Sequence, residues 1–288
     1  MFTHLHVHTW FSMGQGASSP EALMAAAAAR GFTALACTDT NGVYGAVEFQ
    51  RTAEEAGIHP ILGVQLVSGG EECVALAMDE RGWGAICRAV TVVHWGTAGR
   101  QVGRSAGNAA PTSHPADLPS CRLADLLAHD RAGALILSAS VPFLERIVAL
   151  SGPDDVYAEL RPGKARHAVL AAARRLGLPP VVTNAVMFAH AEDWARHRML
   201  VAIGGNTTIS TVEERVRRYD GTTVDDSVPS YRPTVLPSSP DAWLKPAAEL
   251  ARHFPDVPDA IDRAGELAER CRYRIPFGRI IPPRYAEA

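Results

Sequence analysis

Lysine and paired cysteines are nearly absent from this chain. Only Lys164 and Lys245 among its 28 basic residues are lysines, so almost all of the positive charge is carried by arginine. The formal net charge is −3, which excludes a uniformly basic surface of the kind that binds nucleic acid. The five cysteines are scattered without a C-x-x-C pair, and we expect small buried thiols in a reducing compartment.

Signals for membranes and for common nucleotide-binding loops are missing as well. No apolar run is long enough to cross a bilayer, and no basic-then-apolar leader precedes the first strand. Neither a P-loop nor a G-x-G-x-x-G sequence occurs. With 47% hydrophobic and 20% charged residues, the composition predicts a globular protein, and we expect it in the cytoplasm.

Three histidines near the start of the chain alternate with apolar residues, at His4, His6 and His8. Alternate residues of a β-strand share a face, and a turn begins at about Gly14, so His6 and His8 are expected near the end of a strand. Two such imidazoles can hold a metal ion or an anionic substrate. The same pattern is also typical of a half-buried strand whose histidines face water or a polar interior, and the H-x-H alone leaves both readings open.

Strands and helices alternate along most of the chain. Continuous apolar runs bounded by glycine and proline predict buried strands, and alanine-rich runs between them predict helices. Six or seven such units favour a closed (β/α) barrel over an open sheet. The predicted strands span 32–37, 59–66, 73–78, 134–138, 156–160 and 180–183, in addition to the His-rich segment.

Two regions depart from this pattern. Residues 96–120 lose their periodicity and fill with small residues, which indicates a flexible surface insertion. After 190 we expect a long helix over 190–203, an irregular stretch, helices over 241–253 and 258–271, and an extended tail. The predicted organisation is a barrel over 1–190 and a helical appendage over 191–288.

Chemistry in such barrels collects at the C-terminal ends of the strands. The expected strand ends carry, in order, His6, His8, Asp39, Gln65, Ser140 and Asn184. The first three form a partial metal-ligand set. The others are amides and a hydroxyl, which are poor ligands for a divalent transition metal.

Several stretches together resemble one known family. They are HLHVHTWFS from His4, YGAVEFQRTAEEAGIHPILGVQL from Tyr44, DERGWGAICRAVT from Asp79, LPPVVTNAVMFAHAEDWARHRMLVAIGGNTTI from Leu178 and PFGRIIPP from Pro276. In this order they are similar to the PHP (polymerase and histidinol phosphatase) domain, above all to the N-terminal domain of bacterial DNA polymerase III alpha subunits and their error-prone relatives. The resemblance implies a distorted, TIM-like barrel of about seven units. In active members two or three metal ions at the strand ends hydrolyse phosphoesters.

The ligands that the resemblance implies are only partly present. His6, His8 and Asp39 match the family's positions, and Glu72 is a weaker candidate in an alignment that is ambiguous by one residue. Thr40, Gln65, Ala185 and Met187 stand where the family has ligands. The resemblance therefore implies a vestigial site, with no cofactor or with one weakly bound zinc or manganese ion.

The resemblance leads to two functional hypotheses. The first is a polymerase III alpha-like protein of DNA replication or repair that acts as a non-hydrolytic scaffold or partner-binding module for a DNA polymerase core or another replication protein. The second is a metal-dependent phosphoesterase, either a 3′–5′ exonuclease or an enzyme of histidinol-phosphatase type. We expect no nucleotidyl transfer, because the family's polymerase palm lies beyond the point where this sequence stops. DNA is expected to bind weakly or not at all, since the arginines of 215–218 are typical of a solvated face.

Overall fold

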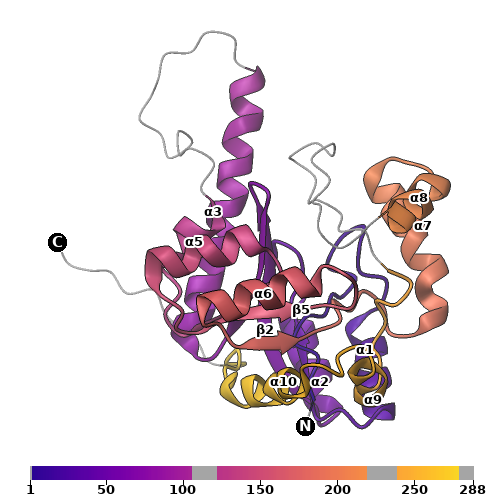
Figure 1. The fold of residues 1–288 in the computed structure, drawn as a ribbon. Helices are drawn as coiled ribbons and strands as arrows, with labels where there is room; N and C mark the ends of the chain where they lie inside the picture. Colours follow the sequence, from indigo (N-terminus) through magenta and orange to yellow (C-terminus); the bar gives the residue numbers. More distant parts are fainter. Residues whose placement is uncertain (1, 106–121, 219–238, 279–288) are drawn as a thin grey trace.

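A computed structural model of the protein describes residues 2–105, 122–218 and 239–278. Six strands form one curled sheet with helices packed around it (Figure 1). The predicted α/β class with a curled, barrel-like sheet is confirmed. In order across the sheet the strands are β1 (Ala34–Cys37), β2 (His59–Ser68), β3 (Glu71–Ala77), β4 (Ala134–Ser138), β5 (Val156–Leu160) and β6 (Pro180–Val182).

The strands are apolar because both of their faces are covered. Every residue of β1, β3 and β4 is buried, and β2 is exposed only toward its two ends. Side chains on one face fill the interior of the curled sheet and those on the other face pack under the helices. This double burial explains why the sequence shows continuous apolar runs instead of alternation.

Strand β3 is the main distortion of the barrel. It runs antiparallel to both neighbours, whereas β1 pairs with β2, β4 with β5, and β5 with β6 in parallel. A tight turn at Gly69 and Gly70, both with positive φ, joins β2 directly to β3 without a helix. The glycine pair predicts a loop here, and the structure shortens that loop to this turn between the two strands. The reversal has a consequence for the site, because it brings the first residues of β3 to the edge where β2 and β4 end.

The His-rich N-terminal segment joins the two edges of the sheet. The amides of Ala36 and Thr38 donate to the carbonyls of His4 and Val7, while the amides of His8 and Val186 exchange hydrogen bonds with the carbonyls of Val186 and His6. The segment was predicted as a strand, but it forms only an isolated bridge between Val7 and Val186. Its neighbours β1 and β6 are too short to support a longer ladder. The extended segment nevertheless closes the ring of strands.

Ten α-helices and one 3₁₀ turn occur in the described ranges. Two of them begin at a serine that caps the helix, as Ser19 accepts a hydrogen bond from the amide of Ala22 and Ser140 accepts one from the amide of Phe143. The α-helices are α1 (Pro20–Ala29), α2 (Ala46–Glu55), α3 (Glu80–Ser105), α4 (Leu123–His129), α5 (Val141–Ser151), α6 (Arg166–Leu176), α7 (Trp194–Gly205), α8 (Ile209–Arg218), α9 (Ala247–Ala251) and α10 (Pro258–Arg270).

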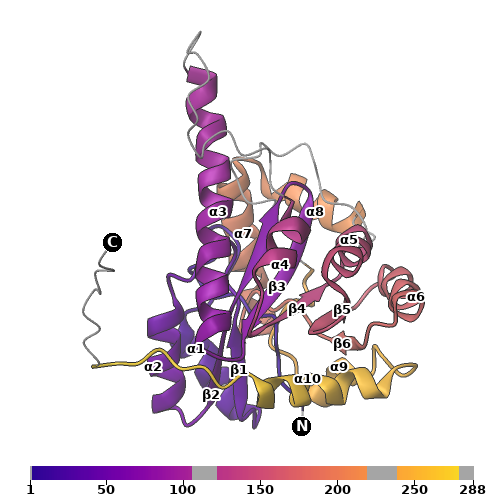
Figure 2. The same ribbon diagram turned by 90° about the vertical axis from the view of Figure 1, so that its left-hand side faces the viewer.

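Helix α3 is much longer than predicted. The sequence predicts a helix over 80–91, yet the helix continues to Ser105 and projects away from the barrel (Figure 2). No proline occurs between Pro60 and Pro111, and each glycine in the stretch costs only about 1 kcal/mol of helix stability without breaking the helix. The first ten residues of the predicted insertion are thus helical. Its remainder, 106–121, lies outside the described residues.

The C-terminal helices α9 and α10 share the main hydrophobic core. Leu244, Leu250, Phe254 and Leu267 are buried in the same cluster as the strands. The predicted helix over 241–253 is shorter, because Trp243 instead forms a bridge with Phe188 and the helix starts only after the next proline. Helices α7 and α8 form a small cluster of their own to one side (Figure 1). The division at residue 190 stays a prediction.

Within the ranges that the structure describes, no helix is both long and apolar enough to cross a membrane.

Candidate functional site

Six side chains from four parts of the chain meet at the strand-end edge of the barrel. His6 and His8 come from the N-terminal segment, and Asp39 follows β1. Glu72 lies at the start of the reversed strand β3, while Glu159 and Arg161 lie at the end of β5. We call these six residues the strand-end cluster. The four predicted site residues, His6, His8, Asp39 and Glu72, are therefore all part of it.

The two histidines are fully buried and contact each other. Their Nε2 atoms are 3.0 Å apart, and His6 Nδ1 lies 2.6 Å from Glu159 Oε1. His8 Nδ1 lies 2.9 Å from the hydroxyl of Ser12. Burial, followed by the positive charges of His6 and Arg161, lowers the pKa of His8 well below its ordinary value. His8 is therefore neutral at physiological pH.

The carboxylate of Asp39 accepts hydrogen bonds from every side. Donors are the amide and hydroxyl of Thr9, at 2.8 Å each, the hydroxyl of Ser12 at 2.6 Å and the thiol of Cys37 at 3.4 Å. Burial raises the pKa of Asp39, and the hydrogen bonds from Ser12 and Thr9 oppose that rise. Four donors leave the carboxylate no role except that of an ionised acceptor.

The hydrogen-bond partners fix where the protons lie. The hydroxyl proton of Ser12 goes to Asp39, so His8 donates its Nδ1 proton to Ser12 Oγ. Neutral His8 then has a bare Nε2, which accepts a hydrogen bond from Nε2 of His6. Nδ1 of His6 contacts Glu159, so both ring nitrogens of His6 have partners within the cluster. Each contact in this chain of side chains is thereby satisfied.

Arg161 holds two carboxylates together on the other side of the cluster. One guanidinium nitrogen donates to Glu72 Oε1 at 3.0 Å and another donates to Glu159 Oε2 at 2.6 Å. Thr183 adds a further hydrogen bond to Glu159 at 2.6 Å. Burial alone would raise the pKa of Glu159, but attraction to Arg161 and His6 outweighs it and holds that pKa far below the ordinary range. Arg161 thus places one positive charge between the carboxylates of Glu159 and Glu72.

Glu159 and Arg161 are the site residues that the sequence interpretation missed. The strand ends after Asp39 were expected to offer only amides and small residues, which is wrong for β5. A signal was present, because a glutamate inside the apolar run VYAEL is followed two positions later by an arginine, and residues two apart on a strand share a face. A buried acid of this kind needs a partner.

Other residues expected at the strand ends have structural partners. Thr40 Oγ1 donates to Gln65 Oε1 at 3.1 Å, so two positions where the resemblance implied ligands now bind each other. The side-chain amide of Asn184 donates to the backbone carbonyls of Asp241 and Trp243 and so connects the C-terminal part to the barrel. Ser140 is the cap of α5.

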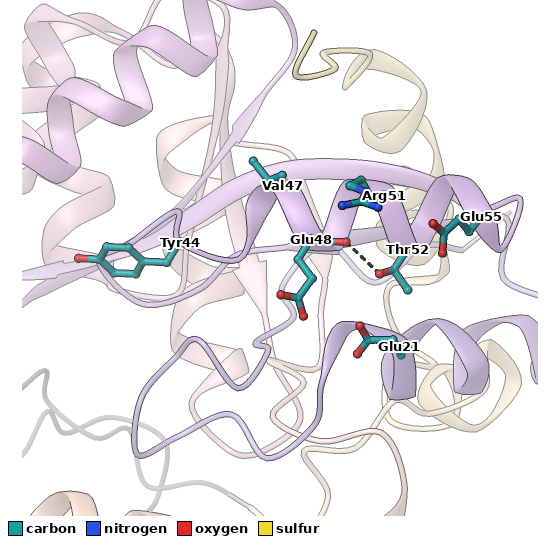
Figure 3. A pocket seen from close by; sticks show the side chains of 7 residues that line it. All are labelled: Glu21, Tyr44, Val47, Glu48, Arg51, Thr52 and Glu55. Carbon is teal, nitrogen blue, oxygen red and sulfur yellow. Dashed lines mark hydrogen bonds between the residues drawn. The ribbon is translucent and has the colours of Figure 1, made fainter. Parts of the chain in front are cut away.

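A separate hollow of about 450 Å³ lies between α1 and α2 (Figure 3). Its lining residues are Glu21, Tyr44, Val47, Glu48, Arg51, Thr52 and Glu55. None of them belongs to the strand-end cluster, and three of the seven are glutamates on the helix surfaces. The hollow therefore offers no extension of the cluster toward a substrate.

The chain that forms this cluster also matches a protein-family model. Residues 4–161, more than half of the chain, match the PHP domain. The chain belongs to the PHP domain family. All six residues of the strand-end cluster lie within the matched range.

The relatives of this PHP domain extend the likeness to nearly the whole chain. The error-prone DNA polymerase of Symbiobacterium thermophilum is 34% identical over 99% of the chain, and the DNA polymerase III subunit alpha of Escherichia coli K12 is 29% identical over 99%. The chain spans 26% and 24% of their lengths, about a quarter of the curated relatives that it matches. Among solved structures, an amidohydrolase from Chromobacterium violaceum superposes with a TM-score of 0.44 at 19% identity, covering 64% of this chain and 87% of that one.

The cluster of this PHP domain does not fit a metal ion in its present arrangement. A metal needs unprotonated nitrogens and free carboxylate oxygens. Here both ring nitrogens of His6 and both of His8 already have hydrogen-bond partners within the protein. The oxygens of Asp39 are fully occupied. Within 2–105, 122–218 and 239–278, no three histidine, cysteine or acidic side chains are grouped as a metal would require.

Proposed function

We propose that this chain is the PHP module of a DNA polymerase III alpha-like protein in DNA replication or repair synthesis. In that setting it serves as a non-hydrolytic scaffold or partner-binding module. The relatives that match 95–99% of the chain bear the names error-prone DNA polymerase and DNA polymerase III subunit alpha. The proposed partner is a DNA polymerase core or another replication or repair protein, and a cytoplasmic location goes with that role.

One observation carries the non-hydrolytic part of this proposal. The hydrogen-bond chain from Asp39 through His8 and His6 to Glu159 uses the lone pairs that would otherwise bind metal or activate water. Hydrolysis by a PHP-type site depends on water bound to a metal with an open coordination position. Because these lone pairs are engaged in hydrogen bonds within the cluster, the arrangement supports a structural role.

Metal content and hydrolysis test this role directly. The full chain, purified without chelator, should carry no stoichiometric zinc or manganese. It should also hydrolyse neither p-nitrophenyl phosphate nor a labelled single-stranded DNA above the level of a His8→Ala variant. Stoichiometric metal together with activity that His8→Ala abolishes would show that the non-hydrolytic role is wrong.

A second experiment tests the partner. A polymerase III alpha polypeptide from a relative, lacking the quarter that corresponds to this chain, is mixed with the chain and analysed by size-exclusion chromatography. We expect co-elution and a polymerase with a longer half-life at elevated temperature. Separate elution with an unchanged half-life would contradict the scaffold role.

The alternative function, a metal-dependent phosphoesterase, has one observation in its favour. Two nitrogens bound to the same tetrahedral zinc at about 2.0–2.1 Å lie roughly 3.3 Å apart, and the Nε2 atoms of His6 and His8 are 3.0 Å apart. Loss of their shared proton would leave both lone pairs facing one point. The measurement of metal content above decides between this arrangement and the closed hydrogen-bond chain.

A further inference from the structure

Arg161 is the cation that compensates the acidic side of the strand-end cluster. Its guanidinium donates to Glu72 on β3 and to Glu159 on β5, and its side chain is only 16% exposed. Glu159 is fully buried. Two carboxylates at such a depth are stable as anions only if a cation lies beside them.

The guanidinium of Arg161 contacts one expected metal ligand directly and a second one through its partner. One of its partners, Glu72, is itself a predicted ligand, and the other, Glu159, holds the predicted ligand His6 at 2.6 Å. A divalent cation among these side chains would supply the same two things, positive charge and a common point of attachment. Arginine suits the task because its fork is planar, always charged and able to reach two carboxylates at once.

We propose that the guanidinium of Arg161 takes the electrostatic place of a divalent metal in this barrel, and that removing its charge converts the cluster into a divalent-cation site. The inference rests on the proposed non-hydrolytic role. One oxygen of Glu72, Oε2, is buried and has no hydrogen-bond partner among the described residues. Without Arg161, this oxygen and the freed oxygens of Glu72 and Glu159 are available to a hard cation such as Mn²⁺.

The test compares four full-length proteins. They are the wild type, Arg161→Met, which removes the charge but keeps much of the volume, Arg161→Lys, which keeps the charge, and a control, Arg146→Met. Arg146 forms a bidentate ion pair with Asp125 between α5 and α4, away from the cluster. For each protein, the thermal midpoint is measured in EDTA and in Mn²⁺, and bound manganese is measured by mass spectrometry after dialysis.

Arg161→Met should lower the midpoint in EDTA by about 10 °C, because it leaves buried carboxylates without a counter-charge. Mn²⁺ should restore most of that loss, with about one ion bound per chain. The wild type, Arg161→Lys and Arg146→Met should bind no stoichiometric manganese and show no shift with Mn²⁺. The proposal is overturned if Arg161→Met is as stable as Arg146→Met, or if Mn²⁺ neither binds nor stabilises it.

If Arg161→Met accumulates only as aggregate, the same question is tested by refolding it from denaturant in Mn²⁺ and in EDTA. Recovery that depends on Mn²⁺ supports the proposal, and equal recovery in Mn²⁺ and EDTA overturns it. A second variant, Arg161→Met with Glu72→Gln, should be more stable than Arg161→Met in EDTA, since one unpaired charge is gone. Equal or lower stability of this double variant counts against the proposal.

The outcomes separate this inference from the proposed function. A metal-free, inactive wild type together with an unresponsive Arg161→Met removes only the role assigned to Arg161. Stoichiometric metal and hydrolysis in the wild type remove both.

Discussion

Lowering the pH from 7.5 to 5 should destabilise the protein, because two buried histidines outside the strand-end cluster resist protonation. His4 Nε2 donates to the carbonyl of Lys245 at 2.8 Å and packs edge-on against two phenylalanines. His197 Nδ1 donates to the carbonyl of Gln15 at 2.5 Å. Burial lowers the pKa of each histidine to about 4, against the opposing effect of these backbone hydrogen bonds.

The direction and size of the effect follow from linkage. Between pH 6.5 and 4 the unfolded chain binds a proton at each of these histidines and the folded chain does not, so stability falls as the pH falls. At pH 5 the loss is about 2 kcal/mol for each histidine, or about 4 kcal/mol for both. Domains are commonly stable by only about 5–15 kcal/mol. The effect is therefore large enough to measure.

Two buried carboxylates, those of Glu159 and Asp39, change the stability with pH in other ways than the histidines do. Glu159 has a lowered pKa, so its stabilising effect is lost only as the pH falls below the ordinary range of a glutamate. Asp39 has a raised pKa, so the folded state takes up its proton more readily and acidification favours folding there. Because Asp39 partly offsets the histidines in the wild type, variants of the histidines are needed to isolate their share.

Urea unfolding followed by tryptophan fluorescence at several pH values between 7.5 and 5 provides the assay. His4→Gln and His197→Gln should each reduce the loss of unfolding free energy over that interval by about 2 kcal/mol, since glutamine does not titrate. The exposed His253→Gln is the matched control and should leave the loss unchanged. If the double variant with His4→Gln and His197→Gln loses as much unfolding free energy between pH 7.5 and 5 as the wild type, the reasoning is refuted.

Three further substitutions, with Gly84→Ala as a control for the first, probe the packing that supports the cluster. Gly16→Ala should lower stability by about 3 kcal/mol in thermal unfolding, because the added Cβ would lie 1.8 Å from the carbonyl oxygen of Thr9, whereas Gly84→Ala meets only a flexible side chain and should be neutral or stabilising. Asn184→Ala removes two hydrogen bonds to the C-terminal part and should cost about 1–3 kcal/mol in urea unfolding, with faster proteolysis near residue 241; unchanged values of both would contradict the tether. Leu137→Ala in the fully buried β4 should cost about 2–5 kcal/mol, and a smaller loss would mean that this part of the core can collapse.

Much of the fold could be predicted because the signals are local. Apolar runs bounded by glycine or proline marked the strands, and alanine-rich runs between them marked helices such as α1. The reversal of β3 and the length of α3 could not be read in the same way. The reversal of β3 depends on which strands pair. The length of α3 depends on the absence of a proline between Pro60 and Pro111.

The site was predictable where a residue's role depends on its position at a strand end. His6, His8 and Asp39 were expected together for this reason, whereas Glu72 was expected only from the resemblance; the structure places all four in the strand-end cluster. Arg161 and Glu159 escaped notice because their significance lies in a partner far along the chain. His6 and Glu159 are 153 residues apart in sequence, so only the closed ring shows that the acid is an ion-pair partner.

The closure of the ring by residues 4–8 has a consequence for folding during synthesis. These residues are made about 180 residues before their hydrogen-bond partner Val186. Until then residues 4–8 can pair with β1 on one side only, their other edge has no partner, and the buried histidines have no closed interior to enter. The ring can therefore form only late, which is typical of slow folding dominated by contacts between distant residues. A nascent chain arrested before residue 186 should expose this edge to chaperones, and one arrested well after it should not.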